Sequence, residues 1–531
     1  MVDVALFGAI TLVYLAALLL IGYYGYKRTQ CEDDYLVGGR KMNPIVLALS
    51  YGATMVSTSA IVGFGGVAAN LGMGLVWTIA LAVGVGVFIA FVFYGKRTRR
   101  LGAKLGAVTF ADLLGKRYGS RKVHILTGVI VLIGLPLYAA AILIGGARFI
   151  ETTFDMDYSI ALLAFAIVVA VYVVLGGLIA VMYTDALQGA IMFVGLLILL
   201  VFTYYILGGV THAHEALSDL STLIPQGLKD QGMSSFTSMP EFGSPIWLTL
   251  ITTMVLSIGI GVLTQPQLVV RFLAAKDDRS LNRAVLVGGI FVFLVPISAY
   301  TVGPLTNVYF YQEQGQLAVD AAGGNLDSVI PLFINSAMPE AFVIIFMLAL
   351  LAAAMSTLSS QFHTLGTTLG YDIYAVLKGE RVKKVSGLRS AQIFTVIMIL
   401  TTVVIAFLLP PSIIARATAM FMGLCVGTLL PAYTHGIFSK SPSTKAALAS
   451  MAVGLVTYFT WALFVHSTDA TDIGLCHALF GTDFLLAAPY AYINPLVVSV
   501  LVSSVTLASV KAVESLMTTK EDVPSEIPEV D

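Results

Sequence analysis

Thirteen apolar stretches, each long enough to cross a lipid bilayer as a helix, constrain this chain more than any other feature of its sequence. A membrane-spanning helix needs about 20 consecutive, mostly apolar residues. The predicted spans are residues 4–26, 44–70, 73–95, 123–149, 158–180, 184–208, 245–272, 284–308, 339–370, 388–409, 412–436, 446–466 and 489–511. Charged residues make up only 11% of the chain, whereas soluble domains carry about 25%. The sequence therefore predicts an all-α membrane protein whose first helix is retained rather than cleaved as a signal peptide.

Lysine and arginine fall almost entirely on one side of these spans. Of the 29 basic residues, only Arg148, Lys229 and Arg416 are placed on the other side. Because basic residues are retained in cytoplasmic loops, this asymmetry predicts an N-terminus outside the cell and a C-terminus in the cytoplasm. It also supports the number of spans, since one missed helix would scramble the pattern. We expect a multi-pass protein of the cell membrane.

The second span carries glycines and hydroxyl groups that a purely lipid-facing helix would not need. Within residues 49–66 these are Gly52, Gly63, Gly65, Gly66, Ser50, Thr54, Ser57, Thr58 and Ser59. Such groups at mid-membrane depth indicate a helix whose backbone opens toward something polar. The alternative is a close-packed interface of small residues, which is common between membrane helices.

A second interrupted helix lies five spans further along the chain. Within residues 245–272 the interrupting residues are Ser257, Gly259, Gly261, Thr264, Gln265 and Pro266. Proline removes a backbone hydrogen bond, and glycine tolerates the resulting geometry. Spans two to six and seven to eleven form two consecutive blocks of five. Because each block has an odd number of spans, the second block crosses the membrane in the opposite orientation to the first. An interrupted first helix in each block is typical of transporters with inverted repeats, whose site lies near the membrane midplane.

This pattern divides the chain into six parts. They are the first helix with its cytoplasmic loop (1–43), the first repeat (44–208), an extracellular loop (209–244), the second repeat (245–436), two further spans (437–511) and an acidic, disordered cytoplasmic tail (512–531). A short amphipathic helix is expected at the membrane interface within the loop 96–122, because apolar residues recur there at helical spacing.

Asp185, near the inner start of the sixth span, is the carboxylate that the sequence places well within the bundle. A buried acid is costly unless it is paired or hydrated, which favours a residue on a cation path. A helix-start cap at the interface is the alternative.

The ninth span carries a polar stripe on an otherwise apolar helix. Ser356, Ser360, His363 or Thr364, and Thr367 recur at helical spacing. A stripe of this kind faces protein or water rather than lipid. Two of its hydroxyls and one carbonyl, together with two carbonyls from an unwound segment 53–56, would give five oxygen ligands for an alkali cation. Hydrogen bonding between helices is the alternative, and His363 alone is typical of a packed, satisfied histidine.

The chain resembles the sodium/solute symporter family, which contains sodium-coupled proline, pantothenate and sugar transporters. The segments that carry the resemblance are YLVGGRKMNP (35–44), GGARFIETTF (145–154), GGLIAVMYTDALQG (176–189), TQPQLVVRF (264–272), AAAMSTLSSQ (352–361), DIY (372–374) and KAALASMAVG (445–454). The resemblance covers nearly the whole chain and implies a LeuT-type fold with a 5+5 inverted repeat.

The same resemblance implies a sodium site by position. Its ligands would be the backbone carbonyls of Ala53, Val56 and Ala353 and the hydroxyls of Ser356 and Thr357. Asp185 matches the family's acid just inside this site, on the sodium exit path. The residues expected to face the solute are Ser57, Thr58, Tyr138, Ile258, Val262 and Gln265.

Two departures from the family pattern bear on the solute. Met55 stands where the proline transporters carry an acid beside the sodium ligands, and Ile258 and Val262 stand where they carry two solute-lining aromatics. These differences weigh against proline. The segment 53–66 is more similar to the pantothenate branch, which indicates an organic acid.

We therefore predict a sodium-coupled secondary active symporter that imports a small organic solute by alternating access, as a monomer. The solute would be a monocarboxylate, a pantothenate-like acid or an amino acid, with Na⁺ as the co-transported ion. One alternative is a proton-coupled symporter that works through Asp185 and His363, and another is a membrane sensor with a transporter fold. The sequence does not predict an enzyme, because it contains no HExxH motif, no GxSxG motif in a suitable context and no plausible carboxylate pair. No nucleic-acid partner is expected.

Overall fold

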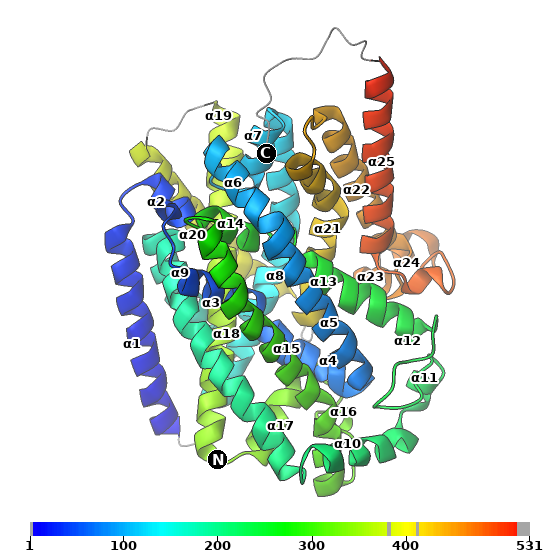
Figure 1. The fold of residues 1–531 in the computed structure, drawn as a ribbon. Helices are drawn as coiled ribbons and strands as arrows, with labels where there is room; N and C mark the ends of the chain where they lie inside the picture. The colour runs from blue at the N-terminus through cyan, green and yellow to red at the C-terminus, as the bar shows by residue number, and fades with distance from the viewer. Residues whose placement is uncertain (1–3, 380–383, 410–413, 518–531) are drawn as a thin grey trace.

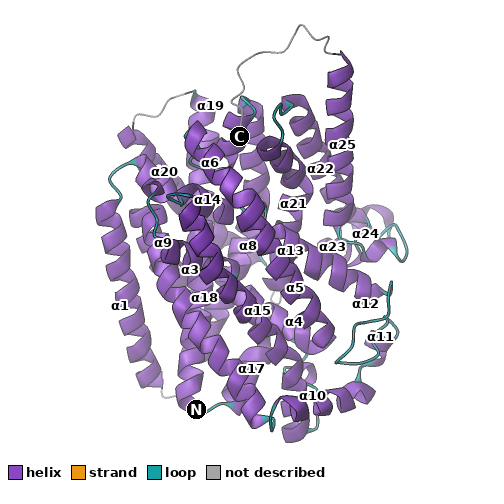
Figure 2. Ribbon diagram, viewed as in Figure 1, coloured by secondary structure: helices purple, strands orange, loops and turns teal. Residues whose placement is uncertain are grey.

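The computed structural model describes residues 4–379, 384–409 and 414–517, and every regular element within these ranges is a helix (Figures 1 and 2). The long elements are α1 (Val4–Arg28), α3 (Pro44–Met55), α4 (Phe64–Leu71), α5 (Met73–Ile89), α6 (Lys96–Leu105), α8 (Arg121–Phe154), α9 (Tyr158–Ile206), α15 (Asp278–Gln314), α18 (Glu340–Thr367), α20 (Lys384–Leu408), α21 (Ile414–Phe438), α22 (Thr444–Phe464) and α25 (Pro495–Met517). In Figure 1, α1 begins at the lower end of the bundle and α25 ends at the upper end, as an odd number of spans requires.

Within the described ranges, ten helices are long and apolar enough to cross a membrane, and the bent pair Pro44–Met55 and Ser59–Leu71 forms an eleventh span. The 49 residues of helix α9 contain two of the predicted spans, because the helix is kinked at Gly177, whose backbone angles are not helical. Gly177 has φ 54°, and a Cβ atom there would lie 2.5 Å from the Tyr35 ring. A predicted span at 73–95 is also helical, through α5 and the π-helix η3 (Ala90–Gly95). The fold is thus the predicted multi-span bundle.

Both interrupted helices are broken as the sequence predicts. Helix α3 ends at Met55, Val56 has extended backbone angles, and the chain resumes as the π-helix η2 (Ser59–Gly63) and α4 at a bend of 51°. In the second repeat, the π-helix η5 (Thr249–Leu256) and α13 (Ser257–Gly261) precede a break, after which α14 (Pro266–Ala274) begins with Pro266 at its first position. Proline fits that position because the first helical N–H has no partner within the helix.

Several shorter elements cap the ends of the bundle. These are α2 (Glu32–Val37), α7 (Phe110–Arg117), α10 (Val210–Asp219), α11 (Gln226–Lys229), α12 (Pro245–Leu248), α16 (Ala318–Ala321), α17 (Val329–Ala337), α19 (Val376–Lys378), α23 (Ser467–Ile473) and α24 (Leu475–Phe480). The predicted short helix in the loop 96–122 is present as α7. Its apolar residues Phe110, Leu113 and Leu114 are buried against the bundle, so α7 packs on protein rather than presenting them to lipid.

Two predicted boundaries differ from the structure. The last span begins at Pro495 rather than at 489, because residues 490–492 form a separate short 3₁₀ turn. Helix α25 then continues to Met517, so the segment expected to be a disordered tail from 512 starts as helix, and residues 518–531 lie outside the described residues. The outer segment 209–244 also forms helices, and its histidines make local contacts, from His212 to the Leu207 carbonyl and from His214 to the Tyr204 hydroxyl.

The outer half of the second broken helix depends on a close backbone contact. A Cβ atom added at Gly86 of α5 would lie 1.8 Å from the Gly259 carbonyl oxygen of α13. Since the obstacle is backbone, no side-chain movement relieves it, and we expect Gly86→Ala to destabilise the protein by about 1–3 kcal/mol. The thermal melting temperature of the purified protein measures this. Gly289→Ala is the matched control, because a Cβ atom there has no neighbour within 4 Å, and an unchanged melting temperature for Gly86→Ala would contradict the packing.

Candidate functional site

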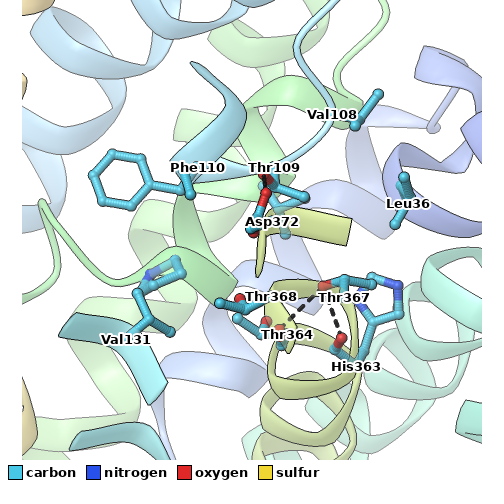
Figure 3. Close-up of a pocket in the computed structure, with 13 residues that line it drawn as sticks. Leu36, Val108, Thr109, Phe110, Val131, His363, Thr364, Thr367, Thr368 and Asp372 are labelled. Carbon is cyan, nitrogen blue, oxygen red and sulfur yellow. Dashed lines mark hydrogen bonds between the residues drawn. The ribbon is translucent and has the colours of Figure 1, made fainter. Parts of the chain in front are cut away.

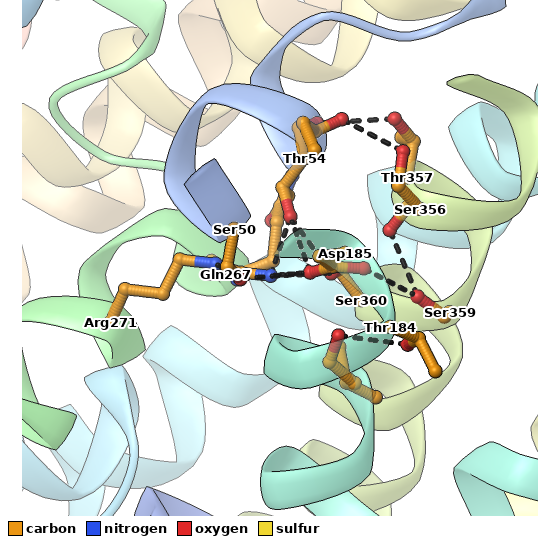
Figure 4. Close-up of polar contacts among 12 residues, drawn as sticks. Ser50, Thr54, Thr184, Asp185, Gln267, Arg271, Ser356, Thr357, Ser359 and Ser360 are labelled. Atoms are coloured by element: carbon orange, nitrogen blue, oxygen red, sulfur yellow. Dashed lines mark hydrogen bonds and ion pairs between the residues drawn. The ribbon is translucent and has the colours of Figure 1, made fainter. Parts of the chain in front are cut away.

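Four of the five residues predicted to bind sodium, all except Val56, lie where the broken helix α3 faces α18; Figure 4 shows Ser356 and Thr357 on α18 opposite Thr54. The Ser356 hydroxyl donates to the carbonyl of Ala53 at 2.9 Å and to that of Ala353 at 3.1 Å. The Thr357 hydroxyl donates to the Thr54 carbonyl at 3.2 Å. The side chains of Ser356 and Thr357 are fully buried. Hydroxyl and carbonyl oxygens from two helices therefore converge on one place, which is the ligand chemistry that hard cations prefer.

Val56 stands at the break itself, where the chain leaves helix α3 with φ −90° and ψ 94°. A broken helix frees carbonyl groups that an intact helix would use internally, and such carbonyls coordinate ions in transporters. Val56 also lines the central cavity described below. An ion held by the Val56 carbonyl would therefore be an immediate neighbour of whatever that cavity contains.

Asp185 is completely buried and forms an ion pair with Arg271 of α14 at 2.7 Å. The sequence counted Arg271, at the end of the span 245–272, among the basic residues on the cytoplasmic side; a place in a cytoplasmic loop is wrong, because Arg271 is only 1% exposed inside the bundle. The cap interpretation of Asp185 is also wrong, since the residue lies in the interior of α9, eight residues beyond Gly177. A short charged pair inside the bundle replaces the isolated acid expected from the sequence.

The Arg271 side chain connects the inner halves of both broken helices with two long helices (Figure 4). Its guanidinium donates to Ser50 at 2.9 Å and to the Thr54 hydroxyl on α3, and to the Ser360 hydroxyl on α18 at 2.6 Å. It also donates to the Gln267 carbonyl of its own helix. An arginine guanidinium carries five N–H donors in a fixed planar geometry, so a single side chain can bind several partners at once. The network holds α3, α9, α14 and α18 together directly beside the candidate ion site.

A small central cavity of about 20 Å³ lies on the other side of the break in α3. Of the predicted solute-facing residues, it is lined by Ser57, Tyr138 and Ile258, whereas Thr58, Val262 and Gln265 lie outside its lining. Residues that the sequence did not single out complete it: Phe64, Pro296, Tyr300, Thr418 and Met422 among others. Single polar or aromatic residues on apolar helices have no periodic pattern that would mark them. The cavity has room for about one water molecule.

Among the residues that the structure describes, none that lines the central cavity carries a charged side chain. It does contain Ser57, Ser59 and Ala60, which form the start of the outer half-helix. The Ser59 amide donates to the Ser57 hydroxyl at 3.1 Å and the Ala60 amide to the Ser57 carbonyl at 3.0 Å. Both amides are therefore satisfied within the turn at the break.

Below the ion site, the polar stripe of α18 continues toward the end of the helix. The Thr364 and Thr367 hydroxyls donate to carbonyls one turn earlier in the same helix. His363 places its Nε2 atom 2.8 Å from the Tyr35 carbonyl oxygen and is 2% exposed. The histidine is packed and hydrogen-bonded, as its sequence context indicated.

These features define a class of protein, a membrane transporter of the LeuT type with paired broken helices. The fold closely matches that of a Na⁺-coupled sialic acid symporter solved in a substrate-bound outward-open state, with a TM-score of 0.73 over 97% of this chain and 98% of that one at 18% identity. The sequence is 30% identical over 450 residues to the sodium/pantothenate symporter of Haemophilus influenzae, covering 84% of this chain and 88% of the relative. It is 27% identical to the osmoregulated proline transporter OpuE of Bacillus subtilis, covering 85% and 87%.

The profile of the Sodium:solute symporter family matches residues 35–454. The chain belongs to the sodium:solute symporter family. Its membrane location and its role as a transporter rather than an enzyme follow from this membership and agree with the predictions from sequence.

Proposed function

We propose that this protein imports a small monocarboxylate, either a pantothenate-like organic acid or an amino acid, together with Na⁺ by alternating access. The observation that carries the proposal is that two features adjoin. The Ala53 and Thr54 carbonyls, which accept from Ser356 and Thr357, stand directly before Met55 and Val56 of the central cavity's lining. We assign Ala53, Val56, Ala353, Ser356 and Thr357 as the sodium ligands. A bound Na⁺ would supply the positive charge that a carboxylate in this cavity otherwise lacks.

The ion pair between Asp185 and Arg271 supports a route for sodium release. While Arg271 is paired, its charge compensates Asp185, and the inner halves α3 and α14 are held against α9 and α18. Movement of these half-helices would separate the pair and leave Asp185 to attract the departing cation. We place the N-terminus outside the cell, in agreement with the basic residues on the inner side. We also propose that the monomer is the functional unit.

The energetics limit how such a symporter can work. One sodium ion moving inward gains about 2.3 kcal/mol per 100 mV, and a tenfold gradient adds about 1.4 kcal/mol. Together these concentrate a zwitterion on the order of 500-fold. A monoanion carried with one sodium ion is electroneutral and gains only about tenfold. Strong accumulation of a monoanion would therefore require a second cation.

A thermal-shift screen tests the solute class. L-Proline, other amino acids, pantothenate, simple monocarboxylates and neutral sugars are each added with and without Na⁺. We expect a carboxylate-bearing solute to raise the melting temperature only when Na⁺ is present, because the ion completes its site. Stabilisation by a neutral sugar alone, or by a carboxylate in K⁺ as strongly as in Na⁺, would contradict the proposal. Stabilisation that follows pH rather than Na⁺ would favour proton coupling.

A further inference from the structure

Two cavities on the proposed cytoplasmic side of the ion site meet at a buried carboxylate. The deeper of the two, called here the inner cavity, measures about 20 Å³. It is lined by Thr364, Thr367 and Thr368 and by Asp372 of the π-helix η7 (Thr368–Ala375) (Figure 3). The outer cavity, about 580 Å³, opens beside α7 and is lined by His124 of α8. The His124 Nε2 atom lies 2.8 Å from the Asp372 carboxylate. This contact forms the partition between the two cavities.

Asp372 is held from one side only. The Thr109 hydroxyl donates to its Oδ1 atom at 2.5 Å, and His124 contacts the same oxygen. Asp372 is 1% exposed. Within the described part of the chain, neither contact uses Oδ2, so this oxygen remains available to a ligand in the inner cavity. The contact with His124 supplies a compensating partner while no ion is bound, and a cation at Oδ2 would take over that role because a buried carboxylate needs a counter-charge.

A row of oxygens connects this carboxylate to the candidate sodium site. Ser360 and Thr364 lie on α18, and Thr368 and Asp372 follow at the same four-residue interval on the π-helix η7. Thr364, Thr368 and Asp372 line the same inner cavity. Thr364 uses its hydroxyl hydrogen within its own helix, which leaves oxygen lone pairs for a passing cation. The carboxylate and hydroxyl oxygens of this row suit an alkali cation, and His363, which also lines the inner cavity, has its Nε2 atom bound to the Tyr35 carbonyl.

We propose that Asp372 is a second holding site for Na⁺, on the route from the central ion site to the cytoplasm, and that Thr109 and His124 close it. The proposal rests on the proposed function, since it concerns the release of the same ion. Thr109 also caps α7, accepting a hydrogen bond from the Asp112 amide at 3.0 Å. A shift of α7 would therefore withdraw the Thr109 hydroxyl from Asp372 and open the inner cavity to the outer one.

The outer cavity is wide and is lined by charges of both signs. Its charged lining residues are Glu32, Asp112, Lys116, Arg121 and His124. The Lys116 ammonium is paired with Asp112 at 2.7 Å, and the Arg121 guanidinium donates to the Leu377 carbonyl at 2.7 Å. The positive charge of Arg121 offsets the negative charge of Glu32, so what the outer cavity supplies is a volume wide enough for a departing ion to be hydrated.

Asp372→Asn tests the proposal, because asparagine keeps the shape of the side chain and removes its charge. Proteoliposomes containing the variant are assayed with L-proline and with pantothenate in two ways. The first assay is net uptake driven by a Na⁺ gradient, and the second is solute exchange with saturating Na⁺ on both sides. We expect net uptake to fall about tenfold, while exchange stays within about twofold, since exchange does not require the ion to leave.

Net uptake at the wild-type level, or an equal loss in both assays, would overturn the proposal. If Asp372→Asn does not fold, the same two assays are made on Thr368→Val, which removes one oxygen from the route. This variant should lower net uptake more than exchange. Thr401→Val is its control, because the Thr401 hydroxyl lies on α20 and bonds the Ile397 carbonyl. Variants that behave like an active wild type would overturn this inference alone, whereas a wild type without Na⁺-driven uptake of any solute would overturn the proposed function and this inference with it.

Discussion

Replacing Arg271 with alanine is expected to destabilise the protein by about 3–5 kcal/mol and to abolish uptake. The substitution leaves the fully buried Asp185 carboxylate without its cation 2.7 Å away, and breaking one half of a buried ion pair has a cost of this size. It also removes the donor that joins Ser50 and Ser360. The melting temperature of the purified protein and solute uptake in proteoliposomes measure the two effects. Arg283→Ala, on an exposed turn of α15, is the matched control.

The double variant Arg271→Ala with Asp185→Asn separates the charge from the packing. If the loss comes from an uncompensated carboxylate, neutralising that carboxylate should recover much of the stability, and the two substitutions should be strongly non-additive. Uptake should remain low, because the connection between α3, α14 and α18 is still missing. Additive losses in the double variant would contradict the ion pair as the source of stability.

Ser356→Ala and Thr357→Ala are each expected to raise the Na⁺ concentration needed for half-maximal uptake by about tenfold, which corresponds to about 1.4 kcal/mol of lost ion binding. Each removes one oxygen from the candidate site, and their hydroxyls contact the Ala53 and Thr54 carbonyls of the broken helix. The proteins should still fold, since alanine is a good helix former. The measurement is initial uptake rate against external Na⁺ concentration at fixed membrane potential.

Thr402→Ala controls for loss of a buried hydroxyl in general. Thr402 is equally buried, but it lies on α20 and donates to the Met398 carbonyl of its own helix. Its Na⁺ dependence should match the wild type. An unchanged Na⁺ requirement in both Ser356→Ala and Thr357→Ala would show that sodium binds elsewhere.

The fold and the ion-site geometry were accessible from sequence because they leave strong local patterns. Long apolar runs give the spans, and Pro266 and the glycines of the second span give the breaks. The hydroxyl stripe at helical spacing indicated Ser356, and the family resemblance added Thr357; in the structure their hydroxyls donate to the Ala53 and Thr54 carbonyls. These features depend on residues that are close together in the chain.

The rest depends on partners that are distant in sequence. Arg271 stands at the end of an apolar run, where a basic residue ordinarily marks a cytoplasmic loop. Only its pairing with Asp185, 86 residues away, shows that it is buried. The available signal was Asp185 itself, since an intramembrane acid calls for a counter-charge nearby. Tyr300 and Thr418 of the central cavity carried no signal, because they are isolated polar groups on apolar helices.

Sodium-driven uptake by the purified protein in proteoliposomes tests the central claim most directly. An inward Na⁺ gradient with an inside-negative potential should accumulate a carboxylate-bearing solute above its external concentration. The same potential with K⁺ in place of Na⁺ should not, and neither should a pH gradient alone. Accumulation that is equal in K⁺, or that follows the pH gradient without Na⁺, would contradict sodium coupling through the site formed by α3 and α18.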